Sequence, residues 1–281
     1  MGTCELLRGT TVYLSGPMDF VMCREEERAN GWRSRVSDVL QSWGVRVLDP
    51  WFKPIVRSQG REYGIEDETT TEERQKWDFA ATQRAAHARA DVAGAFWPVM
   101  HLDLRMVDLS DFVVACCPTN LYSVGTPHEI VVARQQRKPV LLVSPPVRYP
   151  RWRELRQRLD GVPEMRALLD AVATEAVVKE NPTGAPSQWY TSLVDTESFF
   201  DGFGWSHFRR RFSWSDSYLD ERELPPNEPV RPLLPYLEEV HAETLRPQRW
   251  DRRTGRYTDN DDWLLLEAQA EQAEGKDNSG T

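Results

Sequence analysis

The chain has 281 residues, of which 40% are hydrophobic and 28% charged, and its formal net charge is −9. Such a length holds one or two domains, and the composition is ordinary for a globular protein. The negative charge argues against a binder of nucleic-acid polymers or anionic membranes, because both need a basic face. The charge is uneven: residues 1–180 carry 24 basic and 25 acidic side chains, whereas residues 181–281 carry 11 and 19.

The four cysteines, at positions 4, 23, 116 and 117, form no C-x-x-C pair and have no histidine at a zinc-ligand spacing. No metal and no cofactor are therefore expected. The N-terminus lacks a basic region followed by an apolar stretch, and no apolar run reaches the roughly 20 residues that span a bilayer. We therefore predict a cytoplasmic protein without a membrane segment.

Short apolar runs alternate with longer amphipathic stretches in the first 180 residues. The predicted elements are, in chain order, strand 11–14, helix 25–43, strand 45–48, loop 51–68, helix 71–96, a short helical turn at 104–109, strand 112–117, helix 127–136, strand 140–143 and helix 152–178. Gly44 is expected to end the first helix. This alternation predicts an α/β fold with a doubly wound parallel sheet and flanking helices, as in flavodoxin-like or Rossmann-like proteins. Ligands of such sheets bind beyond the carboxyl ends of the strands.

The last 101 residues have a different pattern. Five prolines lie between Pro225 and Pro235, so no regular element is expected to run through them. Ten aromatic residues between Trp189 and Tyr218 argue against simple disorder. The predicted organisation is an α/β domain over 1–180, an acidic, aromatic and proline-rich extension over 181–268 that packs on the core or on a partner subunit, a last helix at 263–273, and a disordered tail over 269–281.

Two segments that follow predicted strands are unusual: Tyr13 to Met18, and Ser123 to Glu129. In the second, Thr126, Pro127 and Glu129 have the spacing of a capping box, in which the glutamate only accepts from a backbone N–H. Alternatively, a carboxylate at a helix N-terminus, on the ligand-binding edge of a sheet, is held ionised by the helix dipole and acts as a nucleophile.

Together these segments resemble the nucleoside 2-deoxyribosyltransferase family, which includes the related 2′-deoxynucleoside 5′-monophosphate N-hydrolases. The resemblance covers about residues 10–150, and it rests on the order and spacing of Tyr13 to Met18, Asp103-Leu104, Ser110 to Ala115, Gly125 to Glu129 and Lys138 to Val143. It implies cleavage of an N-glycosidic bond through a covalent glycosyl-enzyme, with net retention. It also implies a homo-oligomer.

The resemblance assigns roles by position. Glu129 falls at the catalytic nucleophile, and Tyr13 at the tyrosine whose hydroxyl orients it. Asp103 falls at the acid that contacts and protonates the leaving base, since a base anion leaves poorly without a proton. Asp111 matches a strand-opening aspartate that we interpret as structural. His128 adjoins the nucleophile, but neighbours on a helix point to different faces, so no role is expected for it.

Ser123 departs from the pattern of the transferases that act on free nucleosides, which carry an aspartate six residues before the nucleophile. Serine there is similar to the monophosphate N-hydrolases, because a hydroxyl can donate to a phosphate that a carboxylate would repel. Ser15, Gly16 and Gly125 are expected to supply further phosphate or sugar contacts. Hydrolysis, with water as the acceptor, is therefore favoured over exchange with a second base.

Asp19 and Trp51 are weaker candidates for substrate binding. Asp19 follows the Gly16 loop and would touch the sugar, unless it is an exposed loop acid. Trp51 follows the second strand and would stack on a base, unless it caps the core.

Two other functions compete with this prediction. A cytokinin-activating-type phosphoribohydrolase also has a signature ending in Gly-Thr-x-x-Glu, but the paired glycines before that motif are missing here, where Ser123-Val124 stands. A non-catalytic nucleotide-binding sensor or interaction module would use the aromatic extension as its partner surface.

Overall fold

The computed structural model describes residues 5–18, 23–53, 56–58, 61–63, 74–144, 147–176, 178–182, 187, 233–243, 248–251 and 253–259. Statements about the structure concern these residues. The predictions for Asp19, for the aromatic residues between 189 and 218, for the helix at 263–273 and for the tail lie outside them.

The centre of the fold is a four-stranded sheet in which every pairing is parallel. The strand order is β2-β1-β5-β6. The strands are β1 (Thr11–Ser15), β2 (Arg46–Leu48), β5 (Phe112–Cys116) and β6 (Val140–Val143). The predicted α/β fold with a doubly wound sheet is confirmed. The chain continues from β1 to β2 on one side of the sheet and from β5 to β6 on the other, so the loops after these two neighbouring strands diverge. Ligands of such sheets bind where the strand order changes in this way.

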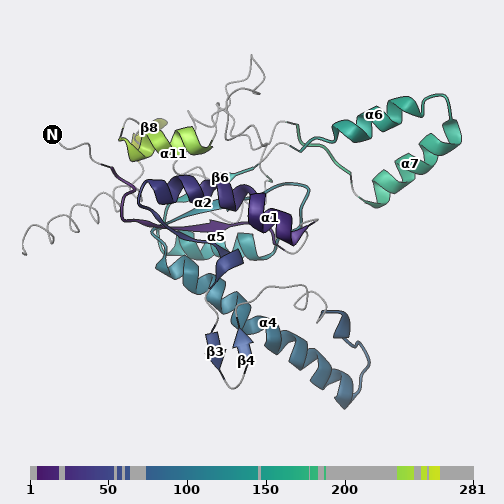
Figure 1. Ribbon diagram of the computed structural model, residues 1–281, viewed down its shortest axis with the longest axis horizontal. Coiled ribbons are helices and arrows are strands. Elements are labelled where there is room, and N and C mark those ends of the chain that lie inside the picture. The colour runs from purple at the N-terminus through teal and green to yellow at the C-terminus, as the bar shows by residue number, and fades with distance from the viewer. Residues whose placement is uncertain are drawn as a thin grey trace, which may run out of the picture.

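Helices cover both faces of this sheet (Figure 1). One face packs against α2 and α11, whose bounds are Trp32–Ser42 and Leu233–His241. The other packs against α4 and α5, which span Gln83–Leu109 and Gly125–Gln135. Strand residues are buried on both faces, which explains the continuous apolar runs in the sequence.

The alternation along β1 decides which of its side chains face α4 and α5. Val12 and Leu14 belong to the core under α2 and α11, whereas Tyr13 belongs to the core under α4 and α5. Successive strand residues point to opposite faces, so Ser15 faces the same side as Tyr13. Asp111, which precedes β5, accepts a 2.7 Å hydrogen bond from the backbone N–H of Thr11 and so ties the two central strands together.

The predicted helix over 25–43 is divided at Gly31 into α1 (Arg24–Asn30) and α2. Helix α2 ends as expected: Gly44 follows its C-cap with φ of 81°, a left-handed conformation that glycine adopts without steric cost.

The segment between β2 and β5 differs from the prediction. The predicted loop over 51–68 contains the 3-10 turn η1 (Pro50–Phe52) and an antiparallel hairpin of β3 (Val56–Ser58) and β4 (Arg61–Tyr63). The predicted helix over 71–96 and the helical turn at 104–109 are confirmed for residues 83–96 and 104–109, but they belong to one continuous helix that begins later than predicted. A short 3-10 turn η2 (Arg74–Lys76) precedes the single helix α4, which begins after its N-cap Thr82 and continues through Pro98.

The predicted helix over 152–178 is two helices, α6 (Pro150–Arg158) and α7 (Pro163–Glu175). They form an arm that projects from the body of the protein (Figure 1). Its base is closed by paired backbone hydrogen bonds between Val147 and Asn181. Neither helix has a buried residue, and Leu168 is 59% exposed. The apolar residues of α6 and α7 are therefore not part of the core.

Part of the C-terminal extension belongs to the core. Leu237 and Val240 of α11 are fully buried, and the ring of His241 stacks on Trp43 at 5.2 Å. The expectation that no helix runs through the prolines was wrong at Pro235, which lies in the first turn of α11. Its missing N–H has no intrahelical acceptor there. A short hairpin of β7 (Gln248–Asp251) and β8 (Arg256–Asp259) follows.

Within the described part of the chain, no helix combines the length and the hydropathy that crossing a membrane requires.

Candidate functional site

Glu129 lies in the first turns of α5, at the carboxyl edge of the sheet, and its carboxylate is bonded to β1. The Tyr13 hydroxyl donates to Oε1 at 2.9 Å, and the Ser15 hydroxyl donates to Oε2. The N-cap residue of α5 is Val124, and its side chain makes no capping bond. The capping-box interpretation of Glu129 is therefore wrong: its two oxygens accept from side chains of a neighbouring strand.

Burial dominates the electrostatics of this carboxylate. Removal from water raises the pKa of Glu129, while the bonds from Ser15 and Tyr13 and the charges of Arg33 and Lys53 oppose that rise. Burial and the adjacent Glu129 charge raise the pKa of Tyr13 well above its usual value. Tyr13 is consequently a neutral hydroxyl that only donates to the glutamate.

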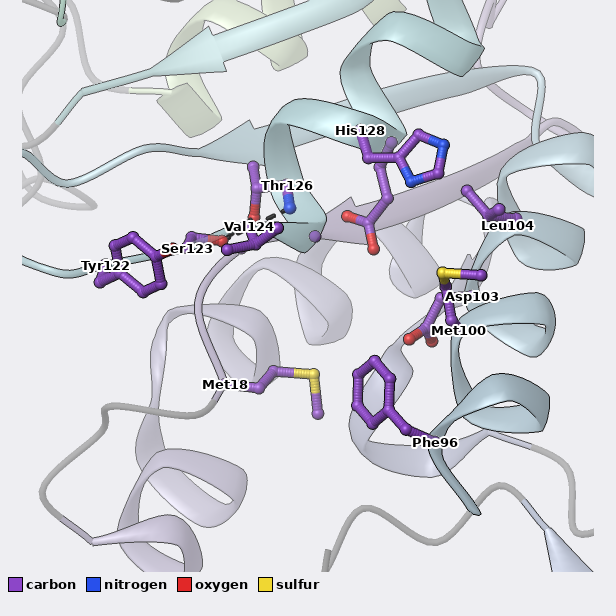
Figure 2. A pocket seen from close by; sticks show the side chains of 13 residues that line it. Met18, Phe96, Met100, Asp103, Leu104, Tyr122, Ser123, Val124, Thr126 and His128 are labelled. Carbon is purple, nitrogen blue, oxygen red and sulfur yellow. Dashed lines mark hydrogen bonds between the residues drawn. The ribbon is translucent and has the colours of Figure 1, made fainter. Parts of the chain in front are cut away.

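A pocket of about 170 Å³ opens beside Glu129. Its walls come from the loop after β1, from α4 and from the first turn of α5, and they include Gly16, Met18, Phe96, Met100, Asp103, Leu104, Ser123, Gly125 and Glu129 (Figure 2). The apolar wall of Met18, Phe96, Met100 and Leu104 faces a few polar groups. This is a common composition for a small-molecule site.

Asp103 lines the pocket from α4, and it is held by a lysine that sequence reasoning did not identify. Nζ of Lys53 lies 2.8 Å from Oδ1 and 2.9 Å from Oδ2 of Asp103. The Lys53 side chain is 1% exposed and that of Asp103 is 15% exposed. Lys53 follows η1, far from Asp103 in sequence, and no spacing in the sequence links the two.

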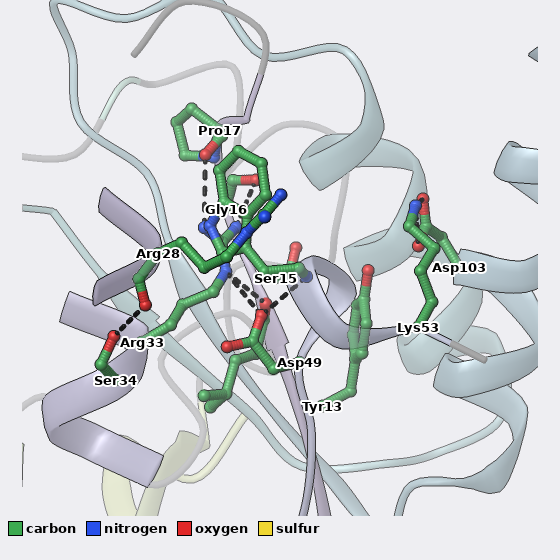
Figure 3. A network of polar contacts seen from close by, with 12 residues as sticks. Tyr13, Ser15, Gly16, Pro17, Arg28, Arg33, Ser34, Asp49, Lys53 and Asp103 are labelled. Atoms are coloured by element: carbon green, nitrogen blue, oxygen red, sulfur yellow. Dashed lines mark hydrogen bonds and ion pairs between the residues drawn. The ribbon is translucent and has the colours of Figure 1, made fainter. Parts of the chain in front are cut away.

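Arg33 is a second residue that the sequence did not single out. Its fully buried guanidinium donates to the carbonyl oxygens of Leu14, Gly16 and Pro17, at 3.1, 2.7 and 3.4 Å (Figure 3). A Cβ added to Gly16 would lie 3.0 Å from Nη2 of Arg33. Arg33 therefore holds the loop after β1 in place, and a larger residue at position 16 would have to displace its guanidinium.

Ser123 and Gly125 both line the pocket at the N-terminus of α5. The Ser123 hydroxyl donates to Oγ1 of Thr126 at 2.8 Å and accepts from the Thr126 N–H at 3.4 Å. Ser123 therefore lies just before α5 and bonds to its first turn. An anion bound here would compete with Thr126 for the hydroxyl proton of Ser123.

Trp51 is not among the pocket-lining residues. Its side chain is buried, and the guanidinium groups of Arg24 and Arg28 lie 5.9 and 5.4 Å from its ring centroid. The structure thus agrees with the alternative that Trp51 is a core residue. The predicted stacking of Trp51 on a base is not supported, because Trp51 does not line the pocket.

His128, for which no role was expected, lines the pocket with Glu129. Both residues lie near the N-terminal end of α5, which forms part of the pocket wall. The described residues include no group of three or more metal-ligating side chains.

The arrangement joins a buried, doubly hydrogen-bonded carboxylate to a largely apolar pocket that a second carboxylate, that of Asp103, also lines. Comparison of the chain with protein-family models, with curated proteins and with solved structures gives no match. The function must therefore be inferred from this geometry and from the resemblance in the motifs.

Proposed function

We propose that the protein cleaves the N-glycosidic bond of a 2′-deoxynucleoside or nucleoside 5′-monophosphate, with Glu129 as the nucleophile. The observation that carries this proposal is the pair of hydroxyl donors on Glu129, which leave the carboxylate oriented toward a pocket. A glutamate that only stabilised the fold would not need to lie in a pocket wall. The resemblance to nucleoside 2-deoxyribosyltransferases supports the same role, and Asp103, which falls at the acid of that family, lines the same pocket.

The proposed reaction has two displacements. An oxygen of Glu129 attacks C1′, the C1′–N bond breaks, and the base leaves with the bonding electron pair and takes up a proton. Water then attacks C1′ of the glycosyl-enzyme, the ester bond to Glu129 breaks, and the water proton passes to solvent. A second base can replace water, which would make the enzyme a transferase. The sugar keeps its configuration in both cases.

A preference for monophosphates rests on Ser123 and on the N-terminus of α5, where backbone N–H groups and the helix dipole favour an anion. The pocket has two acidic lining residues, Asp103 and Glu129, and the position of Ser123 does not add a third carboxylate that would repel a phosphate. The expected cytoplasmic location and the expected homo-oligomer remain predictions that this site does not test.

The test is incubation of the protein with nucleosides, 2′-deoxynucleosides and their 5′-monophosphates, with and without a second base, and chromatographic detection of the released base. Base release from a 2′-deoxynucleoside 5′-monophosphate is expected. Intact-protein mass spectrometry should detect a transient adduct of one deoxyribose phosphate.

Two variants separate catalysis from binding. Glu129→Gln keeps the size of the side chain and removes its charge, and it should reduce base release by roughly 10³-fold or more while the nucleotide still binds. Glu164→Gln makes the same change on α7, outside the pocket, and should match the wild type. Binding without base release in the wild type would support the sensor alternative, and release from ribonucleoside monophosphates alone would support the phosphoribohydrolase.

A further inference from the structure

The arm formed by α6 and α7 exposes an apolar stripe. Met165, Leu168 and Val172 stand at positions i, i+3 and i+7 of α7, so they share one face of the helix. Their exposed fractions are 50%, 59% and 47%. A contiguous exposed apolar patch is uncommon on a monomer and marks a surface that binds another element or protein.

The arm cannot derive its stability from its two helices alone. They have 9 and 13 residues, and isolated helices shorter than about 12–15 residues are marginal in water. Neither helix has a buried residue, and the arm projects from the body of the protein (Figure 1). The ion pair of Arg156 with Asp170 joins the two helices, but its side chains are 42% and 44% exposed, and such pairs contribute little. A surface that covers the stripe would therefore stabilise the arm.

The two helices of the arm carry opposite charges. Helix α6 has four arginines and one glutamate, which gives +3, whereas α7 has three acidic residues and one arginine, which gives −2. Arg151 and Arg158 are two turns apart, so they lie on one side of α6. Their side chains are 93% and 74% exposed, and they share one partner, Glu154.

The acidic helix has a side that is turned away from its own α6. Asp170, which pairs with α6, is two positions from Leu168 and therefore points to another side of α7. Ala171 and Glu175 stand three and seven positions after Leu168, so they adjoin the stripe, and both are exposed. This side of α7 can face the basic helix of another arm.

We propose that the stripe binds the arm of a second copy of this chain, and that the two arms form a four-helix bundle. The stripes fill the centre of the bundle. Each α6 lies between its own α7 and that of the other copy, so that helices of +3 and −2 alternate around the bundle. A second copy fits this surface because a two-fold arrangement is self-complementary, and each arm brings both a basic and an acidic helix.

This pairing goes beyond the proposed function and does not depend on it. No residue of α6 or α7 lines the pocket. The arm also follows residues 10–150, which carry the resemblance to nucleoside 2-deoxyribosyltransferases, so the resemblance does not imply this surface.

Sedimentation equilibrium of the full chain measures the pairing, and the wild type should be a dimer. Leu168→Glu places a charge in the stripe and should raise the dissociation constant by about 10-fold or more. Leu109→Glu makes the same change at the C-terminal end of α4, where Leu109 is 49% exposed, and should leave the dissociation constant unchanged.

Charge reversal tests which helices face each other. Arg151→Glu with Arg158→Glu changes α6 from +3 to −1, and Ala171→Arg with Glu175→Arg changes α7 from −2 to +1. Each double variant alone should dimerise more weakly than the wild type, because helices of like charge would then meet. An equal mixture of the two should form the heterodimer, in which every α6 again faces an α7 of opposite charge. Native mass spectrometry distinguishes the heterodimer from the homodimers.

A wild type that stays monomeric overturns the proposal, and in that case a loss of stability in Leu168→Glu would assign the stripe to residues 189–218 of the same chain. A dimer whose dissociation constant Leu168→Glu leaves unchanged overturns it as well, because another surface then joins the copies. So does a mixture of the charge variants that shows no preference for the heterodimer.

Discussion

The hydrogen bond from Tyr13 to Glu129 leads to a quantitative prediction for Tyr13→Phe. The variant keeps the ring in the core and removes one of the two hydroxyl donors on the carboxylate. The bond is 2.9 Å long and both residues are buried, at 1% and 8% exposure. A hydrogen bond to a charged group contributes about 1.5–3 kcal/mol. Because this bond lowers the pKa of Glu129, its loss should raise that pKa further.

The carboxyl carbon of Glu129 reports this change directly. Titration of glutamate-labelled protein by ¹³C NMR, with the Glu129 signal assigned by its absence in Glu129→Gln, should give a midpoint above 4.5 in the wild type, since burial already raises that pKa. Tyr13→Phe should move the midpoint further up. Under the proposed function the acidic limb of the pH–rate profile moves by the same amount, because the nucleophile must be ionised.

Tyr149→Phe is the matched control. Its hydroxyl accepts from Asn120 at 3.2 Å, away from the pocket, and its removal should leave the Glu129 midpoint unchanged. An unchanged or lowered midpoint in Tyr13→Phe would refute the reasoning, because the tyrosine would then not stabilise the ionised carboxylate.

Three further changes test the support of the site by thermal or denaturant unfolding. Gly16→Ala places a Cβ 3.0 Å from Arg33 and should cost about 1–3 kcal/mol, whereas Gly94→Ala, with no atom within 4 Å and inside α4, should stabilise by about 0.5–1 kcal/mol. Arg33→Leu leaves three carbonyl oxygens without their donor and should lower the free energy of unfolding by about 3 kcal/mol or more. A loss below about 1 kcal/mol would contradict the role of Arg33 in holding the loop after β1. Leu237→Ala should cost about 2–5 kcal/mol if α11 is part of the core, and an unchanged midpoint would show that it is not.

Several local patterns in the sequence determined structure without help from the rest of the chain. The apolar runs at 112–116 and 140–143 predicted buried parallel strands because both of their faces are covered. Gly44 ended α2 because its backbone adopts a positive φ. The carboxyl ends of β1 and β5 meet at one edge, so the segments of Tyr13 and Glu129 were predicted to lie together, and their hydroxyl–carboxylate bond bears this out.

Other features depended on contacts between residues far apart in sequence. Periodicity predicted one helix over 152–178, whereas the structure has two helices, α6 and α7, which form an arm without buried residues. Pro235 predicted a break in regular structure, but it lies in the first turn of α11, where a backbone N–H has no intrahelical acceptor. The capping box at Glu129 was locally correct in spacing, and β1 offered its carboxylate two better donors.

The sequence by itself determined the sheet, its ligand-binding edge and the two residue types that meet there. The tertiary structure decided which basic side chains contact the site. Lys53 reaches Asp103 across 50 residues, and Arg33 reaches the loop of Gly16 from a helix on the other face. Long basic side chains have no spacing rule that would reveal such partners, because their position depends on how the separate elements pack.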